Sequence, residues 1–135
     1  MAVLVIVVAG LATFIFGPKV SEKKEVAETI SSTFDNSKVK EFSMTSYTDI
    51  IDGEYHPNFS VKDITVNKGD SVRIKITEIS GNHDFKIDEF GVYTVTDLNK
   101  EATVEFVADK AGEFIYYCTK PSHRQNGQWG TLKVI

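Results

Sequence analysis

One stretch of the sequence, from Cys118 to Gly130, carries three side chains that could bind a metal ion together. Cys118, His123 and Gln128 follow one another with four residues between successive members. A thiolate is a soft donor, an imidazole is intermediate and an amide oxygen is weak, and a trigonal copper site with a long axial bond uses this combination. The spacing therefore predicts that one loop supplies most of the ligands of a mononuclear copper site.

A second imidazole has to come from another part of the chain, and His83 is the best placed candidate. It shares its strand parity with Phe85 and Ile87, so it points toward the expected core. Taken alone, a single cysteine in a β-rich protein is more often a small buried apolar residue. The joint order of His83 and the three loop residues favours a metal site instead.

The third histidine, His56, serves as a comparison. It lies in Asp52–Pro57, a segment rich in turn-forming residues. We therefore expect an exposed loop residue, with a remote ligand role left open.

Length and charge limit the possible functions. The chain has 135 residues, of which 41% are hydrophobic, which is enough for one core and one domain. The net charge of −4 and the absence of a stripe of lysine and arginine argue against a nucleic-acid partner. The single cysteine cannot form an internal disulfide, so it leaves a free thiol and gives no direct information on the redox compartment.

The N-terminal residues 1–17 contain no charged side chain. As a helix they would reach about 25 Å, the lower limit for crossing a membrane. A signal-peptide core or a buried core segment would also be apolar, but there is no basic start and no convincing cleavage pattern. We therefore expect an uncleaved hydrophobic helix that anchors the protein, with the domain on the extracytoplasmic side. Three lysines just after the run (Lys19, Lys23 and Lys24) favour the opposite orientation, unless a basic segment precedes Met1.

Residues 18–38 are predicted to form a polar linker, with a short helix over Ser21–Ile30. From residue 39 to residue 135 the apolar residues alternate with a period of two, and turn signals recur every eight to twelve residues. This pattern predicts an all-β domain, a Greek-key β-sandwich. The phase of the alternation changes at Asp63, and we expect a β-bulge there.

The region Lys40–Ile135 resembles the cupredoxins, the family of small blue-copper electron carriers. The resemblance is carried by the start of the strand at His83, by the run Val107–Cys118 and by the ending His123–Leu132. It implies equatorial imidazoles from the two histidines, a thiolate from the cysteine, and one copper ion per chain.

The axial ligand is where this sequence departs from plastocyanin-like members, which have methionine at the position of Gln128. In this respect it resembles the stellacyanin-type proteins, whose axial ligand is glutamine. The stretch Asn82–Val92 also resembles nitrosocyanin and the copper domain of cytochrome oxidase subunit II. The binuclear site of the latter needs two cysteines, so it is excluded. The nitrosocyanin likeness leaves a second candidate axial ligand, a carboxylate such as Glu54.

The resemblance implies one-electron transfer between redox partner proteins, without enzymatic activity. His123 would be the exit for the electron, with Pro121 and Trp129 as an apolar docking rim. Two alternatives stay open. A more open copper centre could bind a small molecule such as nitric oxide, or the protein could carry or store copper. A carrier would favour exposed methionine and cysteine clusters, whereas the domain has only Cys118 and Met44.

Overall fold

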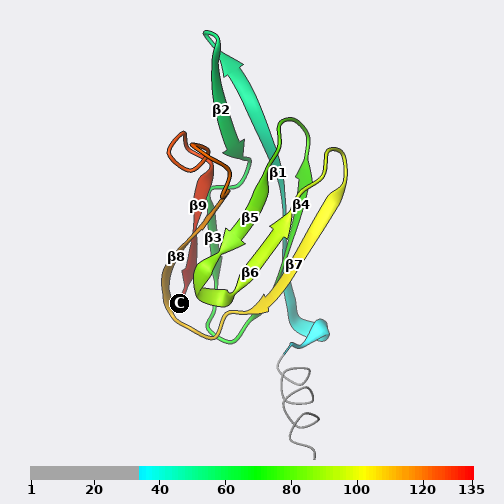
Figure 1. Cartoon of the computed structure of the whole chain (residues 1–135). Coiled ribbons are helices and arrows are strands. Elements are labelled where there is room, and N and C mark those ends of the chain that lie inside the picture. The colour runs from blue at the N-terminus through cyan, green and yellow to red at the C-terminus, as the bar shows by residue number, and fades with distance from the viewer. Residues whose placement is uncertain (1–33) are drawn as a thin grey trace, which may run out of the picture.

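The computed structural model describes residues 34–135, which form nine strands and two short 3-10 helices (Figure 1). The strands are β1 (Val39–Ile51), β2 (Glu54–Phe59), β3 (Asp63–Val66), β4 (Ser71–Glu78), β5 (Asp84–Ile87), β6 (Val92–Val95), β7 (Glu101–Val107), β8 (Gly112–Tyr117) and β9 (Trp129–Val134); the helices are η1 (Asn36–Lys38) and η2 (Asp88–Phe90). The expected hydrophobic helix and most of the expected linker lie outside the described residues. Within residues 34–135, no helix has the length and apolarity to span a membrane.

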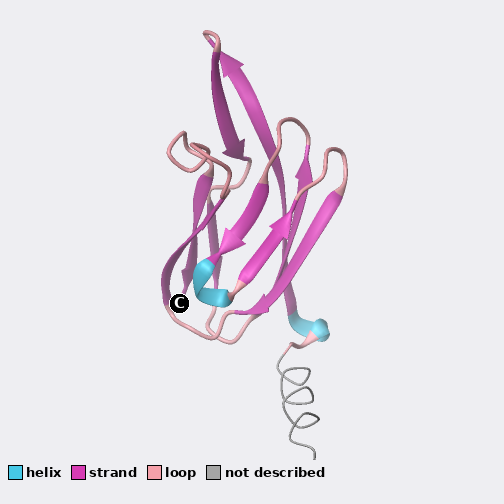
Figure 2. Cartoon of the chain, in the orientation of Figure 1, coloured by secondary structure: helices cyan, strands magenta, loops and turns pink. Residues whose placement is uncertain are grey.

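The strands form two mixed sheets that face each other (Figure 2). One sheet has the order β2-β1-β4-β7 and the other β3-β9-β8-β5-β6. β1 pairs with β4, and β3 with β9, in parallel, whereas the other paired strands are antiparallel. The predicted all-β sandwich is confirmed.

The core lies between the sheets and follows the period-two pattern of the strands. Val72, Ile74 and Ile76 of β4 have no exposed surface, as the period-two alternation of apolar residues predicts. Burying a side chain of this size contributes about 1.5–3 kcal/mol. In the opposite sheet, the rings of Phe85 and Tyr116 stack with their centroids 5.4 Å apart. This packing gives the domain a rigid interior on which a site can be built.

The predicted β-bulge at Asp63 is wrong, because the chain changes sheets there. β2 ends at Phe59 in the four-stranded sheet, and β3 begins at Asp63 in the five-stranded sheet. Crossing from one sheet to the other reverses which face of the chain meets the core. The phase of the alternation changes for that reason.

The long hairpin of β1 and β2 projects beyond the sandwich (Figure 1). Asp52 and Gly53 form its tip with positive φ angles of 53° and 84°, the backbone that Asp-Gly pairs favour in two-residue hairpins. His56 is exposed, as expected, but it belongs to β2 and not to a loop. The sequence analysis missed this hairpin, although the Asp-Gly pair was a signal for it.

Candidate metal centre

Two neighbouring strands bring the ligand-bearing segments to one end of the sandwich. Cys118 directly follows β8, and His83 directly precedes β5. Because these strands are antiparallel and Lys86 pairs with Tyr117, the end of β8 meets the start of β5. The loop between β8 and β9 lies at the same end as the β1–β2 hairpin (Figure 1).

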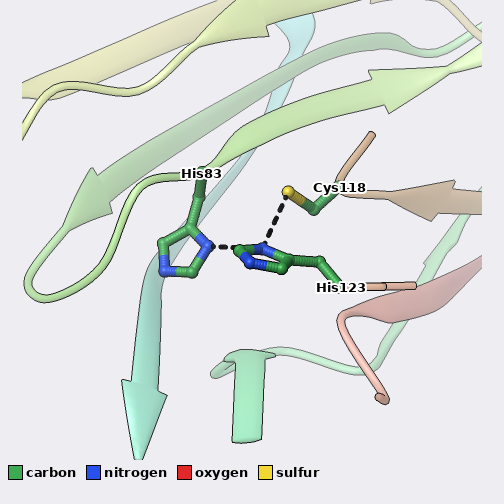
Figure 3. A group of neighbouring side chains, drawn as sticks. All are labelled: His83, Cys118 and His123. Carbon is green, nitrogen blue, oxygen red and sulfur yellow. Dashed lines mark hydrogen bonds between the residues drawn. The ribbon is translucent and has the colours of Figure 1, made fainter. Parts of the chain in front are cut away.

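The structure brings the four residues predicted from the sequence together. Figure 3 shows three of them, His83, Cys118 and His123. Nδ1 of His123 lies 3.2 Å from Nδ1 of His83, 3.5 Å from Sγ of Cys118 and 3.0 Å from Oε1 of Gln128. Three of the four side chains are buried, and that of His123 is half-buried. One soft donor, two imidazoles and one amide oxygen therefore converge on one point.

The ring of His83 is oriented by the turn that precedes it. Its Nε2 lies 2.8 Å from the backbone oxygen of Ser80, to which it can donate. This bond leaves Nδ1 unprotonated and directed at the cluster, as a ligating imidazole requires. Burial lowers the pKa of His83 and so favours the neutral ring. The Ser80 carbonyl and Glu78 have smaller, opposing effects on this pKa. A Cβ at Gly81 would collide with this ring, so the turn needs a glycine there.

The amide of Gln128 is oriented by the opposite sheet. Its Nε2 donates to the backbone oxygen of Asn58 at 3.2 Å, so Oε1 points at His123. The ammonium group of Lys62 donates to the backbone oxygens of Gly127 and Trp129 and holds the chain on both sides of Gln128.

The surroundings of the Cys118 thiol have opposing effects on its pKa. Burial raises its pKa to about 11, while the backbone N–H groups of Lys120 and Asp84 lower it. A bound cation therefore has to displace the thiol proton, as metal ions do at cysteine ligands.

Sequence analysis missed two buried carboxylates beside the cluster. Asp84 accepts bonds of 2.5 Å from the backbone nitrogen and from the hydroxyl of Thr119. Burial raises the pKa of Asp84, but these bonds outweigh it and hold the pKa below its usual value. Glu78 accepts from the backbone nitrogen of His83 at 3.0 Å and from the hydroxyl of Thr96 at 2.6 Å. The alternation pattern could have indicated that Glu78 is buried, because it shares the parity of the inward-facing residues of β4.

The remaining candidates lie farther out. Glu54 is exposed at the start of β2 and is not part of the group that the two histidines and the cysteine form. The loop between β8 and β9, called the ligand loop below, is separated from the β1–β2 hairpin by a cleft of about 520 Å³. His123 borders this cleft, and Pro121 lines it as well. Trp129 is 44% exposed and pairs with Tyr117, and it does not line that cleft.

The donor set fits copper. Two imidazole nitrogens, a sulfur and an amide oxygen direct lone pairs at a common point, where a cation is needed to balance them. Thiolate with imidazole suits copper, whereas calcium and magnesium prefer several carboxylate or carbonyl oxygens. The group of His83, Cys118 and His123 thus points to copper binding.

Comparison with known proteins agrees with the fold and with copper binding. The family profile described as cupredoxin-like domain matches residues 5–132. Nitrous-oxide reductase of Cupriavidus necator is 31% identical over 83 residues, which are 58% of this chain and 13% of the relative. The enzyme of the same name from Stutzerimonas stutzeri is 36% identical over 67 residues, 47% of this chain and 10% of the relative. The chain therefore corresponds to a small part of these curated relatives.

Solved structures show the same fold at lower identity. Copper nitrite reductase from Nitrosomonas europaea has a TM-score of 0.62 at 18% identity, covering 72% of this chain and 41% of the enzyme chain. Reduced auracyanin from Roseiflexus castenholzii has a TM-score of 0.59 at 17% identity, covering 70% of this chain and 96% of its own. With the profile match over nearly the whole sequence, the two mixed sheets and the histidine–cysteine–histidine cluster, this chain belongs to the family of cupredoxin-like domains.

Proposed function

We propose that this chain carries single electrons between redox partner proteins, with one copper ion held by His83, Cys118, His123 and Gln128. The observation that carries the proposal is the convergence of these four donor atoms at one buried point. Copper, when bound, supplies a one-electron couple between its two oxidation states.

The chain's own contribution is to keep the donor atoms in place. Backbone oxygens of Ser80 and Asn58 orient His83 and Gln128, and a backbone nitrogen of Lys120 faces the Cys118 sulfur. Because these partners are main-chain groups of a packed sandwich, the donors need little rearrangement when the charge at the centre changes. A small rearrangement favours fast electron transfer.

His123 is the proposed route for the electron. Its ring is the half-buried member of the cluster, and it borders the cleft that Pro121 also lines. A partner docked at this end of the sandwich would approach the centre through this ring. Trp129 is exposed but does not line this cleft, so its docking role stays a prediction from the sequence.

The activity of the enzymes among the relatives is not proposed for this chain, because the chain matches only 13% of the length of the first of them. The proposed function is therefore that of an electron carrier and not of a catalyst, as the sequence resemblance also implies. A copper carrier is less well supported, because Met44 is 4% exposed and sits in the core.

A second candidate function rests on the cleft beside His123, whose volume of about 520 Å³ could admit a small molecule. Nitric oxide added to the copper-loaded protein separates the two functions. An unchanged optical spectrum supports electron transfer alone, whereas a new band from a bound ligand supports the open centre.

The function is tested by changing Cys118→Ser in the full chain. The thiolate supplies both the negative charge and the charge-transfer absorption, and a serine hydroxyl supplies neither. We expect one copper per chain and an intense visible band in the wild type, and loss of the band in the variant. Circular dichroism would establish that the variant is folded. A folded variant with the same colour would contradict the assignment of Cys118.

We further propose that residues 1–17 anchor the protein in a membrane, with the sandwich on the extracytoplasmic side. The absence of charge over this run is the supporting observation.

A further inference from the structure

Two buried carboxylates flank His83 without belonging to the ligand set. Asp84 is 1% exposed and Glu78 is 3% exposed. Among the described residues, neither carboxylate takes part in an ion pair. Lys120 attracts Asp84 only from a longer distance. Buried charges are normally paired or close to a metal ion, so this pair of unpaired acids calls for an explanation.

Hydrogen-bond donors face both carboxylates. Oxygens of Asp84 accept from the backbone nitrogen and hydroxyl of Thr119 at 2.5 Å, and from the hydroxyl of Tyr93 at 3.4 Å. One oxygen of Glu78 accepts from the backbone nitrogen of His83 and from the hydroxyl of Thr96. An ionised carboxylate is an acceptor only, and these surroundings offer it donors.

The same bonds attach the charges to the ligand-bearing segments. Glu78 is bonded to the main chain of His83 itself. Asp84 follows His83 in sequence and is bonded to Thr119, the residue after Cys118. Neither charge can move away from the centre without displacing a ligand.

We propose that Asp84 and Glu78 bias the copper centre toward its more highly charged, oxidised state, an inference that rests on the copper function proposed above. The thiolate of Cys118 contributes one negative charge and the two carboxylates contribute two more. A divalent ion leaves this group with a net charge of −1, and a monovalent ion leaves it with −2. Since the charges lie in a water-poor interior, where Coulomb interactions are weakly screened, the divalent ion is preferred.

The test removes each charge and keeps the shape. Asp84→Asn and Glu78→Gln retain an acceptor oxygen for the backbone nitrogens of Thr119 and His83. In the copper-loaded full chain, each variant should favour Cu(I) over Cu(II) by about tenfold, which for one electron is a rise in reduction potential of about 59 mV. Glu113→Gln is the matched control, since Glu113 is an exposed acid at the opposite end of β8 and pairs with Lys133. Its potential should stay at the wild-type value.

A second measurement does not depend on electron transfer. Titration with zinc(II) should show about tenfold weaker binding in Asp84→Asn and Glu78→Gln than in the wild type or in Glu113→Gln. The unfolding temperature of metal-free Asp84→Asn should be lower than that of the wild type, because the hydrogen bonds that lower the pKa of Asp84 also stabilise the folded chain. A merely structural role predicts the same loss of stability, but with an unchanged potential and an unchanged zinc affinity.

The outcomes separate this inference from the function on which it rests. Unchanged potential and zinc affinity in both variants, or a lowered potential, would overturn the charge bias while leaving electron transfer in place. If one variant does not fold, the other decides. Weaker zinc binding in the variants, combined with no reversible copper couple in the wild type, would support the charge bias and overturn electron transfer. A wild-type chain that binds neither metal would overturn both.

Discussion

At the residue scale, the amide of Gln128 is held at both ends by different partners. Its nitrogen donates to the backbone oxygen of Asn58 in one sheet, and its oxygen faces His123 on the loop of the other. The side chain is fully buried, so solvent does not compete for either group. Such an oxygen is a harder donor than a thioether and favours oxidised copper.

This arrangement predicts the effect of Gln128→Met. Replacing the amide oxygen by a thioether stabilises the reduced ion, so the reduction potential measured by voltammetry should rise. Glu54→Gln is the matched comparison, because Glu54 was the other candidate axial ligand and lies outside the cluster. Its potential should remain unchanged. A shift in Glu54→Gln without one in Gln128→Met would make the carboxylate the axial ligand.

At the scale of elements, the segment that crosses between the sheets also secures the ligand loop. Ser60–Lys62 joins β2 to β3, and the Lys62 side chain reaches the backbone oxygens of Gly127 and Trp129 at 2.8 and 3.1 Å. The backbone oxygen of Lys62 accepts from Thr131. The crossing segment thus clamps the chain before and after Gln128.

We expect Lys62→Met to loosen the loop without unfolding the domain. The lost bonds come from an exposed side chain, so the free energy of unfolding should fall by about 1 kcal/mol or less. Hydrogen exchange of the Gln128 and Trp129 amides should become faster. Lys133→Met removes the same charge from an exposed site on β9 and should leave those amides unaffected. Equal exchange rates in the two variants would contradict the clamp.

At the scale of the whole molecule, the candidate metal centre and the first described residues of the chain lie at opposite ends of the sandwich. η1 and the start of β1 are at one end of the sandwich, and the ligand loop and the hairpin are at the other (Figure 1). Within residues 34–135, the chain therefore enters the sandwich at the end remote from the four candidate ligands.

The proposed anchor is tested by fractionation. The full chain should partition with membranes, whereas deletion of residues 1–17 should give a soluble protein that binds one copper ion as before. The apolar run has no charged residue to favour water, and the ligands all lie in the described domain. Recovery of the intact chain, with its original N-terminus, in the soluble fraction would contradict the anchor.

The sequence alone was enough to predict the all-β sandwich and the residues that come together at the centre. Cys118, His123 and Gln128 lie on one loop, so their proximity follows from local spacing. His83 could be added because its parity is that of Phe85, and parity determines on which side of a sheet a residue lies. These inferences need only the nearest neighbours along the chain.

Tertiary structure decided the interactions between distant segments. The switch of sheets at Asp63, the bond from Gln128 to Asn58 and the position of Asp84 beside Thr119 depend on how strands far apart in sequence pair and face each other. Alternation shows that a residue points inward, but not which residue it meets there. The residues that come together at the centre were therefore readable from the sequence, whereas the bonds that orient them and the buried carboxylates around them were decided by the packing of the tertiary structure.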